Sequence, residues 1–226
     1  MLNRAARYFP ILDEVRSYHD GDCRILEIGS GPQGIGQFYR HPFVGCDVTF
    51  TSNPKAPMQP VVCSGTDLPF ADGSFDIVIA SDVMEHVAPE QREKLVKEAL
   101  RVTQEAAIFG FPCGAPAFEI DKKLLAFYRK QKMQPPVWLE EHMLYPFPGR
   151  DLFQSLPDGW SVRSKPNESL IFHYWVMRKE MLRPWDYAFR LAVLMMPGVV
   201  RWILKFFNHE PSYRTIFIVT RTRRLA

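Results

Sequence analysis

The feature that most limits the fold of this chain is a glycine-rich turn directly after a short apolar run. Residues 24–28 (Arg-Ile-Leu-Glu-Ile) are typical of a buried strand, and Gly29-Ser30-Gly31-Pro32 ends it before a short helix predicted over 33–40. Glycines permit positive φ angles and let a ligand approach the backbone closely. A helix that begins here offers unpaired amide donors to that ligand. The context of strand, turn and helix indicates an α/β fold that binds a nucleotide-like ligand.

The rest of the chain alternates in the same way. Further strands are expected at 43–47, 61–63, 75–80, 106–111, 160–163 and 213–220, and helices at 89–102, around 121–128 and at 150–156. Pro54, Pro57 and Pro60 predict an extended, loop-like stretch before the third strand. Alternation at this spacing implies right-handed crossovers and a parallel sheet.

Length and composition agree with one globular domain. The chain has 226 residues, of which 46% are hydrophobic and 23% charged, and this excludes a disordered or fibrous protein. We expect a single domain over 1–226, with an N-terminal helix over 1–20 whose apolar residues recur at helical spacing. A mostly helical stretch over 166–211 is too long for a plain loop, so we expect it to be a lid-like insertion.

Charge and cysteine usage narrow the class of protein further. The formal net charge is +3, too small to indicate a nucleic-acid binder, so we expect no nucleic-acid partner. The four cysteines include no CxxC pair, which argues against a cysteine zinc site or a disulfide scaffold. The most apolar stretch, 187–207, is interrupted by Arg190, Arg201 and Lys205. We therefore expect no transmembrane helix and a cytoplasmic protein.

Three carboxylates accompany the glycine turn. Glu27 lies just ahead of the first glycine, where it would repel a pyrophosphate and attract a cationic amino-acid moiety. Asp47 ends the next predicted strand, where a carboxylate can accept both hydroxyls of a ribose. Asp67 follows the third strand, where it can accept a hydrogen bond from an exocyclic adenine amine.

Five short motifs follow one another along the chain. They are Glu27-x-Gly-x-Gly, Asp47, Asp67-Leu68-Pro69-Phe70, residues 72–76 (Asp-Gly-Ser-Phe-Asp) and residues 82–87 (Asp-Val-Met-Glu-His-Val). Together they resemble the class I S-adenosylmethionine-dependent methyltransferases, most closely the small-molecule branch called type 11. The resemblance covers roughly residues 22–115. It implies S-adenosyl-L-methionine as cofactor and a Rossmann-like seven-stranded sheet, mostly parallel with the last strand antiparallel.

The resemblance also assigns roles to individual residues. Glu27 and the backbone of Gly29–Gly31 would hold the methionine part, and Asp47 the ribose. Asp67 with Leu68 would hold the adenine, and Ser81 would line the sulfonium region. The cofactor-binding residues that we expect are Glu27, Gly29, Ser30, Gly31, Asp47, Val48, Thr66, Asp67, Leu68 and Ser81.

A second group of residues can act on the acceptor. Asp82, Glu85 and His86 are spaced i, i+3 and i+4, which predicts one face of a helical turn with His86 as general base beside a carboxylate. His142 is a second candidate base. Ordinary packing of Glu85 and His86 stays open as an alternative. A similar acidic-x-x-Glu-His stretch in ubiquinone-pathway O-methyltransferases can hold a divalent cation; here we expect no metal.

The insertion over 166–211 is expected to emerge over the active site. Its apolar residues, with Arg201 and Lys205 on the other face, predict a basic amphipathic helix. This favours a lid for a large apolar acceptor, with peripheral membrane contact through 181–207. A core-packing or dimer-forming helical pair, and with it a homodimer, is an equally open alternative.

These patterns predict an S-adenosylmethionine-dependent methyltransferase that acts on a small or lipid-like acceptor, at oxygen. One alternative is a catalytically silent methyltransferase-like scaffold that binds a partner or a membrane. Another is an NAD(P)-dependent dehydrogenase with the same glycine turn, which Glu27 and the run 67–70 disfavour.

Overall fold

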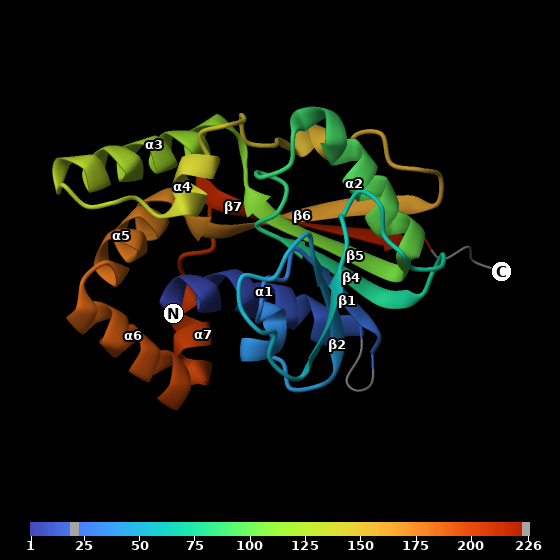
Figure 1. Cartoon of the computed structure of the whole chain (residues 1–226), viewed down its shortest axis with the longest axis horizontal. Helices are drawn as coiled ribbons and strands as arrows, with labels where there is room; N and C mark the ends of the chain where they lie inside the picture. The colour runs from blue at the N-terminus through green and yellow to red at the C-terminus, as the bar shows by residue number, and fades with distance from the viewer. Residues whose placement is uncertain (19–22, 223–226) are drawn as a thin grey trace.

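The computed structural model describes residues 1–18 and 23–222. In this part of the chain, helices pack on both faces of one seven-stranded sheet of order β3-β2-β1-β4-β5-β7-β6 (Figure 1). The strands are β1 (Ile25–Ile28), β2 (Phe43–Asp47), β3 (Met58–Val62), β4 (Phe75–Ser81), β5 (Thr103–Pro112), β6 (Trp160–Ser169) and β7 (Ser212–Arg221). The α-helices are α1 (Leu2–Tyr18), α2 (Pro89–Val102), α3 (Gly114–Lys130), α4 (Val137–Glu141), α5 (Leu170–Glu180), α6 (Arg183–Met195) and α7 (Pro197–Lys205). Two short 3₁₀ helices are η1 (Gly34–Gln37) and η2 (Arg150–Phe153).

The strand directions confirm the predicted sheet. Strands β1 to β5 pair in parallel, whereas β7 pairs antiparallel with both β5 and β6. The central strands β1 and β4 are buried almost throughout, as strands covered on both faces are. Because β6 runs in the same direction as β5, the chain leaves β6 at the edge where the parallel strands end.

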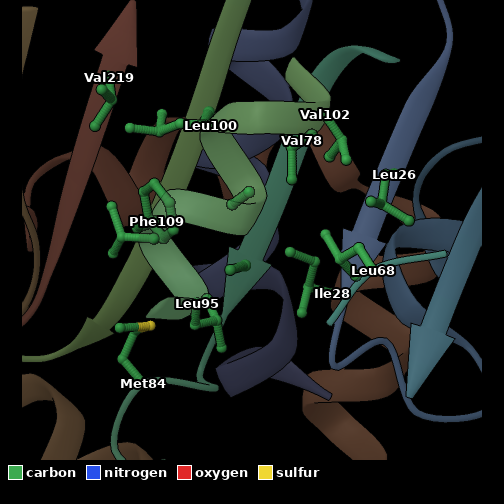
Figure 2. Close-up of a cluster of buried hydrophobic side chains, with 14 of the residues drawn as sticks. Leu26, Ile28, Leu68, Val78, Met84, Leu95, Leu100, Val102, Phe109 and Val219 are labelled. Carbon is green, nitrogen blue, oxygen red and sulfur yellow. The ribbon is translucent and has the colours of Figure 1, made fainter. Parts of the chain in front are cut away.

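Helix α2 covers one face of the sheet. Leu95 and Leu100 of α2 pack with Val78 of β4 and Phe109 of β5 in a single buried cluster (Figure 2). Successive side chains of a strand point to opposite faces, so the alternate residues of β4 belong to the other side of the sheet. That alternation divides the core into two layers.

Helix α1 covers the opposite face and has two buried sides. Toward the sheet, Ile11 and Leu12 pack with Ile77 of β4. On its other side, Phe9 belongs to a cluster that includes Phe172 of α5 and residues of α6 and α7. Helix α1 therefore connects the sheet to the insertion, and Figure 1 shows α5 to α7 curving around its N-terminal end.

The structure corrects two predicted helices. The expected helix at 33–40 is only η1, because Gly34 and Gly36 fall within it and glycine disfavours a longer helix. The expected helix at 150–156 is η2, which ends at Phe153.

Two predicted boundaries also move. The proline-containing stretch that we expected as a loop contributes β3, and Pro60 is tolerated there because β3 is an edge strand. Strand β6 extends to Ser169, so the insertion begins at Leu170 rather than at 166. Positions 19 and 20 of the expected N-terminal helix lie outside the described residues.

The insertion differs from its predicted helical faces. Arg201, expected on an outer basic face, pairs with Asp13 of α1 and lies over the ring of Phe9. The apolar residues Val199 and Trp202 are instead exposed. Among the described residues no single helix is long and apolar enough to cross a membrane, whereas α6 and α7, bent by 108° at their junction, meet that length and composition test together.

Candidate active site

A cavity of about 680 Å³ opens where β1, β2 and β4 end. Open α/β sheets bind ligands at this edge, because the loops there connect strands to helices on opposite faces. The cavity walls come from the glycine turn, the ends of β2 and β3, the turn after β4 and the segment 138–145.

The glycine turn has the backbone that the sequence requires. Gly29 has a φ of +67°, and a Cβ there would overlap the side chain of Val83. The amide of Gly29 donates to the carbonyl of Cys46 in β2 over 2.8 Å. Gly31 has a φ of +56°, and a Cβ at that position would meet no atom within 4 Å. The turn is therefore packed on its inner side and open toward the cavity at Gly31.

Glu27 lies beneath the turn and does not line the cavity. Its side chain is buried, and it accepts hydrogen bonds from the Tyr8 hydroxyl over 2.9 Å and from the Ile35 amide over 2.7 Å. Burial raises the pKa of Glu27 to about 7, although these two donors oppose the shift. The carboxylate braces the turn against α1 and η1, and direct contact between Glu27 and a ligand remains a prediction.

Asp47 lies on the cavity wall at the end of β2. Its Oδ2 accepts a hydrogen bond from the Gly31 amide over 2.9 Å, which ties the strand end to the glycine turn. Val48, the next residue, is 67% exposed and also lines the cavity. The carboxylate of Asp47 and the glycine turn thus face the same space.

Asp82 organises the turn after β4 through two arginines. It accepts hydrogen bonds from Arg214 of β7 over 2.6 and 2.8 Å and from Arg7 of α1 over 3.0 Å. Although burial opposes it, the charges of Arg214 and Arg7 lower the pKa of Asp82 well below its usual range. Asp82 has a φ of +52° and its segment is a turn, so the prediction that Asp82, Glu85 and His86 share one helical face is wrong.

His86 reaches the cavity wall, as Asp82 does. Its Nδ1 lies 3.2 Å from Oε2 of Glu141, the last residue of α4, and its ring packs 4.8 Å from the ring of His142. Burial, and then the charge of His142, lowers the pKa of His86. A neutral imidazole at this position can accept a proton.

Glu85 and His142 lie behind His86. Both are buried, and Nε2 of His142 is 3.8 Å from Oε1 of Glu85. Nδ1 of His142 is 2.6 Å from Oδ2 of Asp121, which also accepts from the hydroxyl of Tyr213. Burial raises the pKa of Glu85, and the charge of Asp82 adds to this shift. The sequence-predicted catalytic residues are therefore brought together, with only His86 on the cavity.

Comparison with known proteins agrees with this architecture. Residues 26–111 match the family described as a methyltransferase domain, Methyltransf_11. An uncharacterized methyltransferase of Mycolicibacterium gilvum is 54% identical over 48 residues, which are 21% of this chain and 18% of that protein. One from Mycobacterium sp. strain KMS is 34% identical over 96 residues, 39% of this chain and 37% of that protein. The matched part thus spans less than half the length of these relatives.

Two solved structures show the same fold. The magnesium protoporphyrin IX methyltransferase from Synechocystis PCC 6803 with bound SAH has a TM-score of 0.55 at 10% identity, covering 96% of this chain and 83% of that one. A putative sarcosine dimethylglycine methyltransferase from Galdieria sulphuraria has a TM-score of 0.53 at 14% identity, covering 97% of this chain and 85% of that one.

Residues 26–111 therefore carry a methyltransferase domain of the type 11 family, and the sheet around them has the fold of these solved methyltransferases.

The cavity of this methyltransferase domain leaves space for the cofactor beside the glycine turn. Gly31 lines the cavity and no atom lies within 4 Å of the place where its Cβ would stand, so a ligand can approach this side of its backbone. Of the predicted cofactor-binding residues, Gly29, Gly31, Asp47, Val48 and Thr66 line this cavity.

The other predicted cofactor residues of the domain lie away from the lining. Ser30 donates to the carbonyl of Gly31, and Leu68 is buried in the α2 core. Asp67 is exposed, and Ser81 is buried at the end of β4. Their roles, like that of Glu27, stay predictions.

Sequence reasoning missed one wall of the cavity in this methyltransferase domain. Trp138, Leu144 and Tyr145 line it, although they lie far along the chain from the glycine turn. The only signal was the aromatic and acidic run before His142. No residue of the insertion after β6 lines the cavity in the described part of the chain, so a lid role for 166–211 rests on no contact here.

Proposed function

We propose that this chain transfers a methyl group from S-adenosylmethionine to an oxygen atom of a small or lipid-like acceptor. The observation that supports this most directly is the shared cavity, in which the glycine turn and Asp47 lie with His86. S-adenosylmethionine supplies a methyl group on a positively charged sulfur.

The proposed cofactor half of the cavity has a separate role for each group. The backbone of Gly29 and Gly31 would hold the methionine part, and Asp47 the ribose hydroxyls. Val48 and Thr66 would flank the adenosine. Because Asp47 is held by the Gly31 amide, these groups are pre-positioned before a ligand binds.

The proposed acceptor half lies toward His86 and the segment 138–145. Trp138, Leu144 and Tyr145 offer apolar contact to an acceptor, and His86 is placed to activate its hydroxyl. In the metal-free protein the neutral imidazole of His86 would take the hydroxyl proton, and Glu141 would orient the ring through Nδ1. Glu85 and His142 would support His86 from behind.

Calorimetry with S-adenosylhomocysteine and NAD tests the cofactor assignment. We expect S-adenosylhomocysteine to bind and NAD to give no heat. Binding of NAD alone would favour the dehydrogenase alternative and contradict the proposal. Incubation with S-adenosylmethionine labelled in the methyl group, together with separate lipid and water-soluble extracts, would then show the acceptor class. Binding without label transfer to either extract would favour a catalytically silent scaffold.

We further propose that α6 and α7 rest on a membrane surface. Their exposed apolar side chains include two tryptophans and a tyrosine, residues typical of the interface between lipid and water. The exposed set is Leu182, Trp185, Tyr187, Leu191, Leu194, Met195, Met196, Val199, Trp202, Ile203 and Phe206. Exposed basic residues, Arg183, Arg190 and Lys205, lie on the same two helices.

Lipid charge and apolar contact together favour a membrane over a second copy of the chain. Basic side chains next to an apolar face attract anionic lipid, whereas in a symmetric dimer they would face one another. Flotation with phosphatidylglycerol vesicles tests this. We expect binding that Trp202→Glu with Phe206→Glu abolishes, and that Ile171→Glu, an exposed apolar site on α5, leaves unchanged. Equal flotation of all variants, or none, would contradict the proposal.

A further inference from the structure

The side chains behind His86 form a site that the methyltransferase domain itself does not explain. One ligand atom each from Glu85, His86 and His142 can be chosen so that all three lie within 4.8 Å of one another. Two of these residues come from the turn after β4, and the third directly follows α4. The fold therefore brings two imidazoles and a carboxylate to one point from separate segments.

The way in which His142 is held decides where its lone pair points. Asp121 is fully buried, lies 2.6 Å from Nδ1 of His142 and accepts two contacts from the hydroxyl of Tyr213, at 2.9 and 3.0 Å. A carboxylate in this position accepts a hydrogen bond from Nδ1–H, which leaves the lone pair on Nε2. That nitrogen faces Glu85, 3.8 Å from Oε1.

Glu85 makes this arrangement unusual. The side chain is fully buried, and neither carboxylate oxygen receives a hydrogen bond from the described residues. A buried carboxylate without a donor is costly, and a cation between Glu85 and Nε2 of His142 would satisfy both groups at once.

We propose that Glu85, His86 and His142 bind a divalent transition-metal ion, with zinc as the first choice. Two imidazoles and one carboxylate suit zinc, iron(II) or manganese, whereas magnesium and calcium prefer oxygen ligands alone. Asp121 and Glu141 would be the carboxylates that orient the two imidazoles, as metal-bound histidines usually require.

This ligand set is not the one that the sequence spacing offered. Both oxygens of Asp82 are occupied by Arg7 and Arg214, so Asp82 is not a ligand, and His142 takes its place. The proposed ion departs from our expectation of no metal. Ion–ligand distances of about 2.0–2.2 Å require the three side chains to close by roughly 1 Å. His86, whose side chain is 31% exposed, has the most room to move.

The ion would lie next to the cavity, reached past His86. There it would leave an open position, because three protein ligands do not complete the shell of zinc. This inference rests on the proposed function. At its open coordination position the ion would bind the acceptor hydroxyl and lower the pKa of that hydroxyl, and the hydroxyl proton would pass to water. With the ion bound, His86 is a ligand and the ion replaces it in activating the acceptor.

Titration of chelator-treated protein with zinc chloride tests the site without any methyl transfer. Calorimetry is expected to show one ion per chain, and thermal unfolding is expected to show a higher Tm with zinc. Glu85→Gln and His142→Gln should each weaken zinc binding at least 100-fold. Asp121→Asn, which alters only the orienting carboxylate, should weaken it about 10- to 100-fold.

Two controls separate a metal ligand from a structural residue. Without zinc, Glu85→Gln should be at least as thermostable as the wild type, because it removes an unpaired buried carboxylate. His41→Gln removes an exposed imidazole far along the chain from the cluster and should bind zinc like the wild type. Cobalt(II) in place of zinc should give a visible absorption spectrum that Glu85→Gln loses.

Either of two outcomes would overturn the inference: zinc fails to bind, or it binds the wild type and Glu85→Gln equally. Binding of S-adenosylhomocysteine to the zinc-free protein is measured separately. Its presence without zinc binding would reject the metal site alone, and its absence would reject the proposed function.

Discussion

Helices α2 and α7 are both amphipathic, but the apolar residues of α2 are buried whereas many of those of α7 are exposed. In α2, Leu95, Leu100 and Val102 are all buried against the sheet. In α7, Val200 and Leu204 pack on α1, whereas the larger side chains Trp202 and Ile203 are more than 40% exposed. The sheet covers the apolar face of α2, whereas most of the apolar face of α7 is left uncovered. An apolar stripe therefore identifies a buried helix only where the fold supplies a surface to cover it.

The largest expected effect on this contrast comes from shortening a buried side chain of α2. Leu100→Ala should lower the free energy of unfolding by about 3 kcal/mol, because it leaves a cavity beneath the helix. Urea denaturation followed by circular dichroism measures this. A loss below about 1 kcal/mol would mean that α2 is not fixed on the sheet as described.

The next largest effect is expected on the pH dependence of stability, through the buried carboxylate of Glu27 beneath the glycine turn. The pKa of Glu27 rises from 4.5 to about 7 on folding. Between these values the folded state keeps a proton that the unfolded chain has lost, so this residue's contribution falls by about 3 kcal/mol as pH rises from 4.5 to 7. It is constant outside that window.

Glu27→Gln should remove this part of the pH dependence of stability. The measurement is the free energy of unfolding between pH 5 and 8, with Glu93→Gln, an exposed carboxylate of α2, as the matched control. The Glu27 variant should give a flatter profile than the control. Parallel profiles for both variants would contradict the buried environment of Glu27.

Asp47→Asn tests the cavity rather than the core. It should weaken S-adenosylhomocysteine binding 10- to 100-fold, or about 1.4–2.7 kcal/mol, because an amide cannot accept two ribose hydroxyls as a carboxylate does. Calorimetry measures the affinity, and an unchanged Tm would show that the fold is intact. Unchanged affinity would remove Asp47 from the proposed site.

The smallest effect is expected on the exposed side of α7. Trp202→Ala should change the free energy of unfolding by no more than about 0.5 kcal/mol, since the side chain is 61% exposed. Sedimentation at several concentrations accompanies the urea denaturation. A large, concentration-dependent loss would break the comparison, because it would mean that a second copy of the chain covers this face.

Local chemistry made the sheet and the glycine turn predictable. Glycines at 29 and 31, apolar runs and a carboxylate at 47 each act through neighbours in sequence. The seven-stranded, mostly parallel sheet with its last strand antiparallel followed from the resemblance that they carry. The short η1 was misjudged because two glycines outweigh its position after a strand.

What the sequence could not predict depends on contacts between distant segments. The meeting of Glu85 with His142, and the cavity wall at Trp138, arise only when α4 packs against the turn after β4. Arg201 was assigned to the wrong face because its partner, Asp13, belongs to α1 and not to its own helix. Helical periodicity does not reveal which side a distant helix will approach.

The pairing of Arg7 with Asp82 has a practical consequence for dissecting the molecule. A fragment trimmed to the segment that matches the family, 26–111, would lack both α1 and β7, and so would lose the two guanidinium groups that fix Asp82. The turn after β4 would then lose the contacts that hold it in place, even if the neighbouring strands stayed folded. Truncated forms of the protein should therefore keep both α1 and β7.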